Sequence, residues 1–109
     1  MADESIIKTV RTYLRAVEKE GIPVKAGVLF GSSVTGKMHE WSDIDLVVIS
    51  PRFDTQRNSS DVDLLWYIAA KTDSRIEPIA VGERQFAEDN SSMIIEIARR
   101  EGQIIPLAE

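Results

Sequence analysis

Cysteine is absent from this 109-residue sequence, and aromatic residues make up only 6% of it. Without cysteine the chain has no disulfide framework, no thiolate zinc site and no cysteine nucleophile. It also lacks a run of about 18 to 20 apolar residues, the length that a membrane-spanning helix requires. The first residues, Met1 to Glu4, are acidic and do not resemble a signal peptide. We therefore expect a cytoplasmic protein with no membrane partner.

Basic residues are few compared with acidic ones. The sequence contains 13 Lys and Arg against 18 Asp and Glu, which gives a formal net charge of -5. A protein that grips nucleic acid normally presents a basic surface to neutralise phosphates, so we do not expect polymeric DNA or RNA as the main partner. A small nucleotide bound together with a divalent cation remains compatible, because the cation supplies positive charge locally.

The remaining composition is that of an ordinary folded domain. Hydrophobic residues make up 43% and charged residues 28% of the sequence, values close to the average for soluble globular proteins. A chain of this length can bury one core, with little to spare. We therefore expect a single domain over residues 1–109.

Hydrophobic periodicity predicts the first half of the fold. Apolar residues at helical spacing predict a helix over residues 3–20, which Gly21 and Pro23 end. Alternation over residues 24–30 predicts a strand with one buried face. The nearly continuous apolar run over residues 44–49 is typical of a central strand covered on both faces.

The second half begins with a helix that follows a polar stretch. Ser60 and Asp63 can form a capping pair at its start, and the spacing of Trp66 places this side chain in the apolar stripe. A strand is predicted over residues 75–81, where Pro78 implies an edge position or a bulge.

The last elements complete the fold class. Ser91 and Ser92 can cap a final helix that ends at Gly102, before a short apolar strand over residues 104–107. The order helix, strand, strand, helix, strand, helix, strand predicts an α/β (α+β) fold, in which helices pack on one mixed sheet.

A candidate phosphate site lies where the first strand ends, at Gly31-Ser32. A strand that turns here toward a helix start presents backbone N–H groups and a hydroxyl in a small space, an arrangement that binds phosphate. Gly31 and Gly36 allow the backbone to turn and approach a ligand closely. An ordinary turn is the alternative interpretation of this pair.

Two carboxylates follow ten residues later, at Asp43 and Asp45. Residues i and i+2 of a strand project from one face about 6.6 to 7 Å apart, so both side chains can converge on one or two cations. Their mutual repulsion is relieved if a cation binds. Oxygen ligands favour Mg²⁺ or Mn²⁺ over zinc. Alternatively, the two are ordinary acidic residues at a strand start and on a solvent-facing edge.

Two more residues are candidates for this site. Glu77, the acidic residue inside the third predicted strand, is the best candidate for a third carboxylate that binds metal or polarises an acceptor hydroxyl. The alternative is a solvated residue on the polar face of an edge strand. Lys37 could reach a triphosphate tail, although surface lysines are common. Asp61 and Asp63 are explained by capping and the helix dipole.

The compound motif in residues 31–48 resembles the defining motif of the DNA polymerase β-like nucleotidyltransferase superfamily. It comprises Gly31-Ser32, then Gly36, then the run from Ser42 to Val48. The chain resembles the minimal nucleotidyltransferase branch of this superfamily, and the resemblance continues through residues 75–79 to 99–102. It implies a nucleoside triphosphate donor, with ATP as the expected nucleotide.

The resemblance also implies the roles of the site residues. It implies two Mg²⁺ ions held by Asp43 and Asp45, with Glu77 at the position of a third catalytic carboxylate, where many relatives carry Asp. Gly31 and Ser32 would bind the nucleotide. Relatives often carry a basic residue between the motif's Ser and its second Gly, whereas residues 33–35 are neutral here.

The same resemblance implies a partner. Small members of this branch are commonly encoded beside a helical HEPN-type toxin, act as its antitoxin, and in some cases transfer AMP to it. We therefore expect a Mg²⁺-dependent nucleotidyltransferase that acts on a separate helical protein. Two alternatives stay open: an antitoxin that acts by binding alone, and a transferase acting on a small molecule of the aminoglycoside type.

Overall fold

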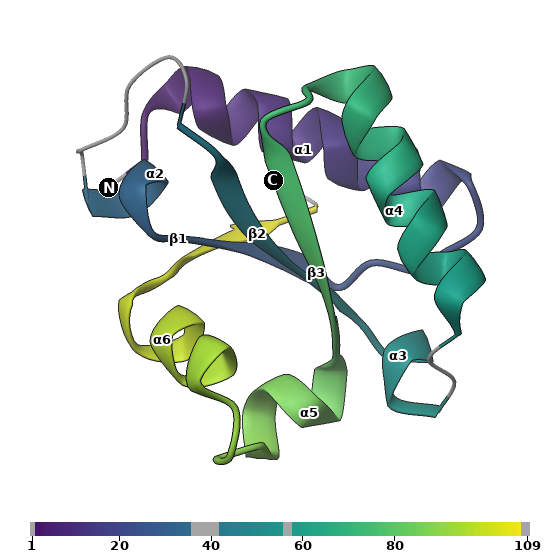
Figure 1. The fold of residues 1–109 in the computed structure, drawn as a ribbon, viewed down its shortest axis with the longest axis vertical. Coiled ribbons are helices and arrows are strands. Elements are labelled where there is room, and N and C mark those ends of the chain that lie inside the picture. Colours follow the sequence, from purple (N-terminus) through teal and green to yellow (C-terminus); the bar gives the residue numbers. More distant parts are fainter. Residues whose placement is uncertain (1, 36–41, 56–57, 108–109) are drawn as a thin grey trace.

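A four-stranded mixed sheet forms the centre of the computed structural model, which describes residues 2–35, 42–55 and 58–107 (Figure 1). The strands lie in the order β3-β2-β1-β4. Their bounds are Ala26–Phe30 for β1, Ile44–Ser50 for β2, Ile76–Gly82 for β3 and Gln103–Pro106 for β4. β1 pairs antiparallel with β2 and β4, while β2 pairs parallel with β3. The predicted α+β fold, one small domain with a mixed sheet, is confirmed.

Three longer helices occupy the positions that the periodicity predicts. They are α1 (Glu4–Lys19), α4 (Ser59–Thr72) and α6 (Met93–Glu101). Three further helices are short: α2 (Ser32–Thr35), α3 (Arg52–Thr55) and α5 (Glu83–Glu88). α2 begins at the helix start expected after Gly31, whereas the sequence did not predict α3 and α5. None of the helices within the described residues is long and apolar enough to span a bilayer.

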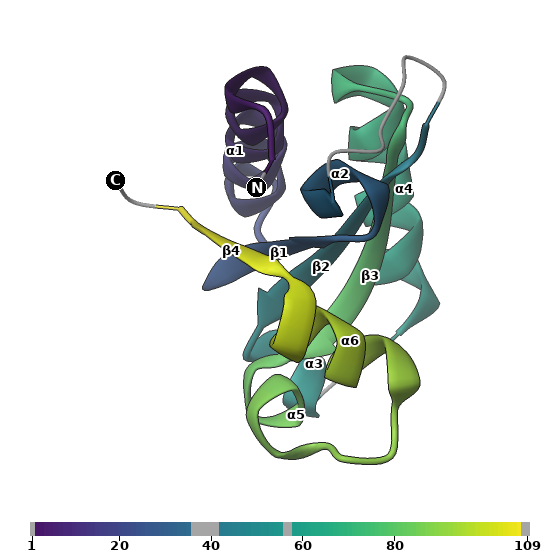
Figure 2. The ribbon, with the colours of Figure 1, turned by 90° about the vertical axis from the view of Figure 1, so that its left-hand side faces the viewer.

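The sheet separates two apolar cores. α1 and α4 cover one face, and α5 and α6 lie on the other (Figure 2). Because side chains alternate along a strand, Leu46 of β2 enters the core under α1 and α4, whereas Val47 enters the core against α6. Both are fully buried, and each contributes about 1.5 to 3 kcal/mol of burial free energy. The prediction that this strand is covered on both faces is confirmed.

Tyr13 links the two helices of the larger core. Its side chain is fully buried, and its hydroxyl donates a hydrogen bond of 2.9 Å to the carbonyl oxygen of Leu65. Burial raises the pKa of Tyr13 above its usual range. The bond satisfies the one polar atom of a large apolar side chain and fixes α1 against α4.

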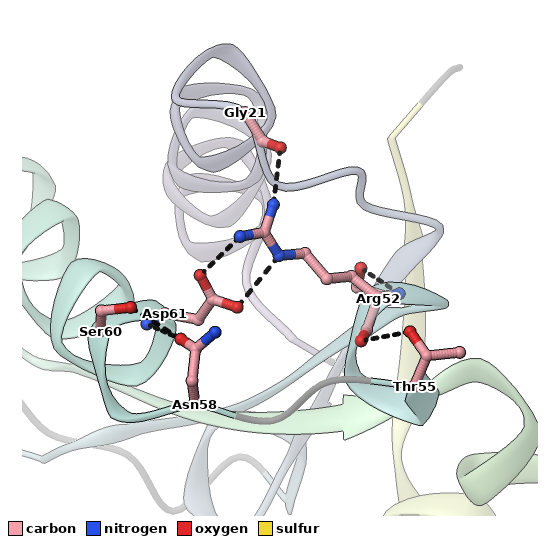
Figure 3. Close-up of polar contacts among 7 residues, drawn as sticks. Gly21, Arg52, Thr55, Asn58, Ser60 and Asp61 are labelled. Carbon is pink, nitrogen blue, oxygen red and sulfur yellow. Dashed lines mark hydrogen bonds and ion pairs between the residues drawn. The ribbon is translucent and has the colours of Figure 1, made fainter.

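An ion pair between half-buried Arg52 and buried Asp61 joins α3 to α4 (Figure 3). Arg52 donates two hydrogen bonds to Asp61, each 3.0 Å long, and a third to the carbonyl oxygen of Gly21 at 3.4 Å. Asp61 is only 5% exposed, so this pairing, rather than capping, explains its position. The predicted capping pair at Ser60 is also wrong, because Asn58 is the N-cap and accepts from the Asp61 amide.

Trp66 differs from its predicted position as well. It is 47% exposed on the outer side of α4, since Leu65 and Ala69 supply the buried stripe of this helix. At the edge of the sheet, β3 carries Pro78 within the strand. An edge strand tolerates proline because the missing N–H costs no ladder bond. The predicted edge position is therefore confirmed.

A carboxylate from a distant segment caps α5. Asp54 of α3 accepts hydrogen bonds from the amides of Arg84 and Gln85 at 2.8 and 3.0 Å. These backbone bonds, that of Arg84 first, lower the pKa of Asp54. Gly82, the residue before α5, offers no side chain for this purpose. The start of α5 is therefore fixed by tertiary contact.

Asp61→Asn should destabilise the fold while its near neighbour Asp63→Asn should not. The first change removes the charge from a buried bidentate pair and should lower the free energy of unfolding by about 1 to 3 kcal/mol. Asp63 is exposed on the same helix, so its substitution should change stability by less than about 0.5 kcal/mol. Urea denaturation measures both. Equal effects would contradict the role assigned to the ion pair.

Candidate functional site

Three strand ends meet at one end of the sheet and bring the predicted site residues together. Gly31 follows the last residue of β1, Asp45 is the second residue of β2, and Glu77 is the second residue of β3. In the ladders, the Cα partners of Asp45 are Phe30 on β1 and Glu77 on β3. Adjacent strands lie about 4.8 Å apart, so this register makes Asp45 and Glu77 direct neighbours on one face of the sheet.

Gly31 has two reasons to be glycine. Its φ of 76° lies in the left-handed region, which side chains disfavour. A Cβ atom placed on Gly31 would also lie only 2.6 Å from Oδ2 of Asp45. The carboxylate of Asp45 therefore lies against the backbone of residue 31, and this contact was not foreseen in the sequence, where Gly31 was interpreted as a turn and phosphate residue.

The chain turns into α2 directly after Gly31. The carbonyl oxygen of Gly31 accepts hydrogen bonds from the amides of Val34 and Thr35 at 3.1 and 3.2 Å. Ser33 is buried, and its hydroxyl donates to the carbonyl oxygen of Phe30 at 3.2 Å. Ser32 is half-buried at the first position of this turn. The turn is thus held by bonds of its own backbone and of Ser33.

Asp43 is exposed and lies one residue before β2. The prediction that Asp43 and Asp45 occupy positions i and i+2 of one strand is therefore wrong for Asp43. It nevertheless lies beside the other two acidic side chains. A side-chain hydrogen bond with Asp43 is the largest cause of the raised pKa of Glu77, followed by burial and by the charges of Asp43 and Asp45. Burial, then the charge of Asp43, raises the pKa of Asp45. The three carboxyl groups therefore form one electrostatic cluster.

This cluster has the chemistry of a site for a hard cation. Within the described ranges, no ion pair joins Asp43, Asp45 or Glu77 to a lysine or arginine. Carboxylate oxygens are ligands that Mg²⁺ and Mn²⁺ prefer, and negative charge without a partner is what a cation would neutralise. The donor set therefore fits such an ion.

The side chains are not yet arranged as a complete ligand set. Among the described residues, no group of three acidic, histidine or cysteine side chains is spaced to hold a metal ion. At the backbone, Asp45 and Glu77 are close neighbours, since they are Cα partners on adjacent strands about 4.8 Å apart.

The structure thus brings together most of the candidates that the sequence identified. Gly31, Ser32, Asp43, Asp45 and Glu77 lie at one end of the sheet. Lys37, predicted to bind the nucleotide, and Gly36 fall outside the described residues. The roles assigned to these residues in binding and catalysis stay predictions.

Comparisons with known proteins agree with this arrangement. The family model for the nucleotidyltransferase domain matches residues 7–105. The structure is similar to that of a putative nucleotidyltransferase from Sulfolobus solfataricus, with a TM-score of 0.60 and 15% identity over 90% of this chain and 77% of that one. It is also similar to a toxin-antitoxin structure with AMP-PNP, with a TM-score of 0.60 and 23% identity over 87% of this chain and 71% of that one. No curated protein matches the sequence significantly.

Gly31→Ala should cost more stability than Gly21→Ala, although both residues have positive φ. Gly21, with φ of 105°, has no atom within 4 Å of a Cβ, so alanine there adds only backbone strain of about 1 to 2 kcal/mol. Alanine at residue 31 also meets the Asp45 carboxylate, which should add about 1 to 3 kcal/mol. In an Asp45→Ala background the added cost should vanish. A double-mutant cycle from urea denaturation measures this coupling, and a coupling near zero would refute the contact.

Asp45→Asn should stabilise the protein at neutral pH in the presence of EDTA. Because the pKa of Asp45 is raised in the folded state, folding favours its protonated form. That contribution is complete below the unfolded-state pKa of about 4 and is lost as pH rises through the folded-state value. Asparagine mimics the protonated form, so Tm should rise by a few degrees at pH 7 and change little below pH 4. Calorimetry at both pH values tests this, and a lower Tm at pH 7 would contradict it.

Proposed function

The chain belongs to the nucleotidyltransferase domain family, and from that premise we propose that it transfers a nucleoside monophosphate, AMP from ATP, to a hydroxyl group of a partner protein. The observation that carries this proposal is the placement of Asp45, which lies against Gly31 on one side and is the ladder neighbour of Glu77 on the other. Phosphate binding at a turn and carboxylates for a cation, side by side, are the parts that phosphoryl transfer to a hydroxyl requires.

Asp43, Asp45 and Glu77 are the residues that would hold Mg²⁺, in two ions, with Mn²⁺ as a substitute. The bound cations would neutralise the carboxylates and the triphosphate and stabilise charge that develops during transfer. Burial and then the charge of Asp43 raise the pKa of Asp45, and a hydrogen bond with Asp43, followed by burial and the two charges, raises the pKa of Glu77. A bound cation would offset this cost of ionising the two side chains, which supports the assignment.

The chain's own residues would orient the two reactants. The N–H groups at the start of α2 and the hydroxyl of Ser32 would bind the phosphates, with Lys37 near the triphosphate tail. Glu77 would accept the proton of the acceptor hydroxyl, whose oxygen bonds to the α-phosphorus while the bond to the β-phosphate breaks and pyrophosphate leaves.

A separate helical protein of the HEPN type is the acceptor that we propose. The resemblance to the minimal nucleotidyltransferase branch supports it, as does the similarity to a toxin-antitoxin structure with AMP-PNP, which includes both a nucleotide analogue and a partner. The chain would then act as the antitoxin and modify its toxin.

The spacing of the acidic side chains favours a second function, which is inhibition of the partner by binding alone. Because the acidic side chains of the described residues are not spaced to hold a metal ion, the protein would also suit an antitoxin that neutralises its partner by binding alone. The neutral residues 33–35 and the glutamate at residue 77 are consistent with weakened catalysis. The two functions differ in whether the partner becomes covalently labelled.

Labelling of the co-purified partner tests the proposed function. The protein that co-purifies with the tagged chain is incubated with Mg²⁺ and ATP labelled at either the α- or the γ-phosphate. Transfer of AMP should leave α-label and no γ-label on the partner, and EDTA should prevent it. Asp43→Asn with Asp45→Asn should reduce labelling by about 100-fold or more, whereas Asp63→Asn, an exposed acidic residue of α4, should not.

The alternative results are equally distinct. Label from the γ-phosphate would indicate kinase activity and overturn the proposal. A stable complex that takes up no label would favour inhibition by binding alone. Labelling of RNA or of an aminoglycoside without a protein partner would replace the proposed acceptor.

A further inference from the structure

A groove of about 300 Å³ runs along the outer face of α1, and we call it the α1 groove. Its lining consists of Glu4, Ile7, Lys8, Arg11, Thr12 and Arg15. Three of these side chains are basic and one is acidic, whereas the whole chain has a formal net charge of -5. The α1 groove therefore concentrates positive charge on a protein that is acidic overall.

The basic side chains of the α1 groove follow one line along the helix. Lys8, Arg11 and Arg15 are three and four residues apart, a spacing that places side chains on the same face of an α-helix. At 1.5 Å per residue, the line is about 10 Å long. Lys8 and Arg15 are exposed. Arg11 is half-buried, and its Nε donates to the carbonyl oxygen of Pro106 at 3.5 Å, so the line adjoins the end of β4 (Figure 2).

Two of these cations have no carboxylate partner within the described ranges. No ion pair joins Lys8 or Arg15 to a carboxylate there, and Glu4, one turn before Lys8, forms none with it. Other basic residues do form such pairs, namely Lys25, Arg52, Arg75 and Arg100. Lys8 and Arg15 can therefore bind carboxylates of another molecule without breaking an ion pair of the described chain.

The length and charge of the α1 groove favour a short acidic helix as its occupant. In a helix, carboxylates three and four residues apart repeat the spacing of the three cations over about 10 Å. Residues on one face of an extended strand lie about 6.6 to 7 Å apart, so three of them span about 13 Å. A long polyanion such as RNA would extend beyond the groove over a chain of net charge -5, which repels it.

We propose that the α1 groove docks a helix of a partner protein, in which carboxylates lie three and four residues apart. Lys8 and Arg15 pair with these carboxylates, and Ile7, which is half-buried against the larger core, supplies an apolar contact. This inference goes beyond the proposed transfer reaction, because it requires neither a nucleotide nor a metal ion. It assigns a surface by which the protein recognises its partner.

Two labelled helical peptides of identical composition test the inference. Both are rich in alanine and carry three glutamates, which lie either on one face, three and four residues apart, or around the whole helix. Fluorescence anisotropy in EDTA, without nucleotide, should show that the one-face peptide binds about fivefold more tightly. Raising NaCl from about 0.05 M to about 0.5 M should weaken its binding about tenfold, because salt screens exposed charges.

Charge reversal tests the residues of the groove. Lys8→Glu with Arg15→Glu should weaken binding of the one-face peptide by about tenfold. Lys19→Glu with Lys71→Glu is the matched control, because both lysines are exposed, lie outside the groove and give the same change in net charge. It should leave the affinity within about twofold. If the groove variant has a lower Tm than the control, Lys8→Gln with Arg15→Gln carries the same test.

Each result bears on the inference. Equal affinities for the two peptides, or equal losses in the two variants, would overturn it, since general charge effects would then explain the binding. No binding at about 1 mM peptide would also overturn it. Tighter binding of an oligouridylate of equal charge would assign the groove to RNA instead, and self-association that the groove variant abolishes would assign it to a second copy. Labelling of the partner by AMP is measured separately, so the proposed function and this inference can fail independently.

Discussion

The close approach of the Asp45 carboxylate to the backbone of residue 31 is the constraint on which the site depends. It ties the end of β1 to the start of β2 at a point where the chain must also turn into α2. Only glycine satisfies both the positive φ and the missing space. Because β2 also pairs with β3, Asp45 lies between the turn after β1 and Glu77 of β3. Three separate segments of the sequence thus meet at this one residue.

Hydrophobic periodicity predicted the helices and strands that bury an apolar stripe or face. It did not predict the helices that contacts with distant segments stabilise. It located α1, α4, α6 and the strands, since each carries its own pattern. It missed α5, because the cap of that helix is Asp54, about 30 residues earlier in the chain. It also misinterpreted Asp61, whose partner Arg52 lies across a turn. Neither residue differs locally from an ordinary solvated aspartate, so only the folded arrangement distinguishes them.

For the candidate site too, the sequence predicted some features and not others. Residue types and spacing identified the carboxylates and the glycine-serine turn, because an acidic pair next to an apolar run is visible in the sequence. The pairing of Asp45 with Glu77 required the parallel register of β2 and β3, which no local pattern encodes. The opposition of Phe30 to Asp45 depends on the antiparallel register in the same way. This opposition follows from the antiparallel pairing of residues 26–30 with residues 45–49, which the sequence analysis did not predict.

Pro78 affects whether the outer edge of β3 can pair with a strand of another molecule. β3 pairs only with β2 among the described strands, so its outer edge is open. A proline at Pro78 deprives this edge of one N–H donor in the middle of the strand. Edge strands with complete donor rows invite pairing with strands of other molecules and aggregation. The edge of β3 therefore resists the addition of a strand from another molecule through its own sequence, without a further element of the sheet to cover it.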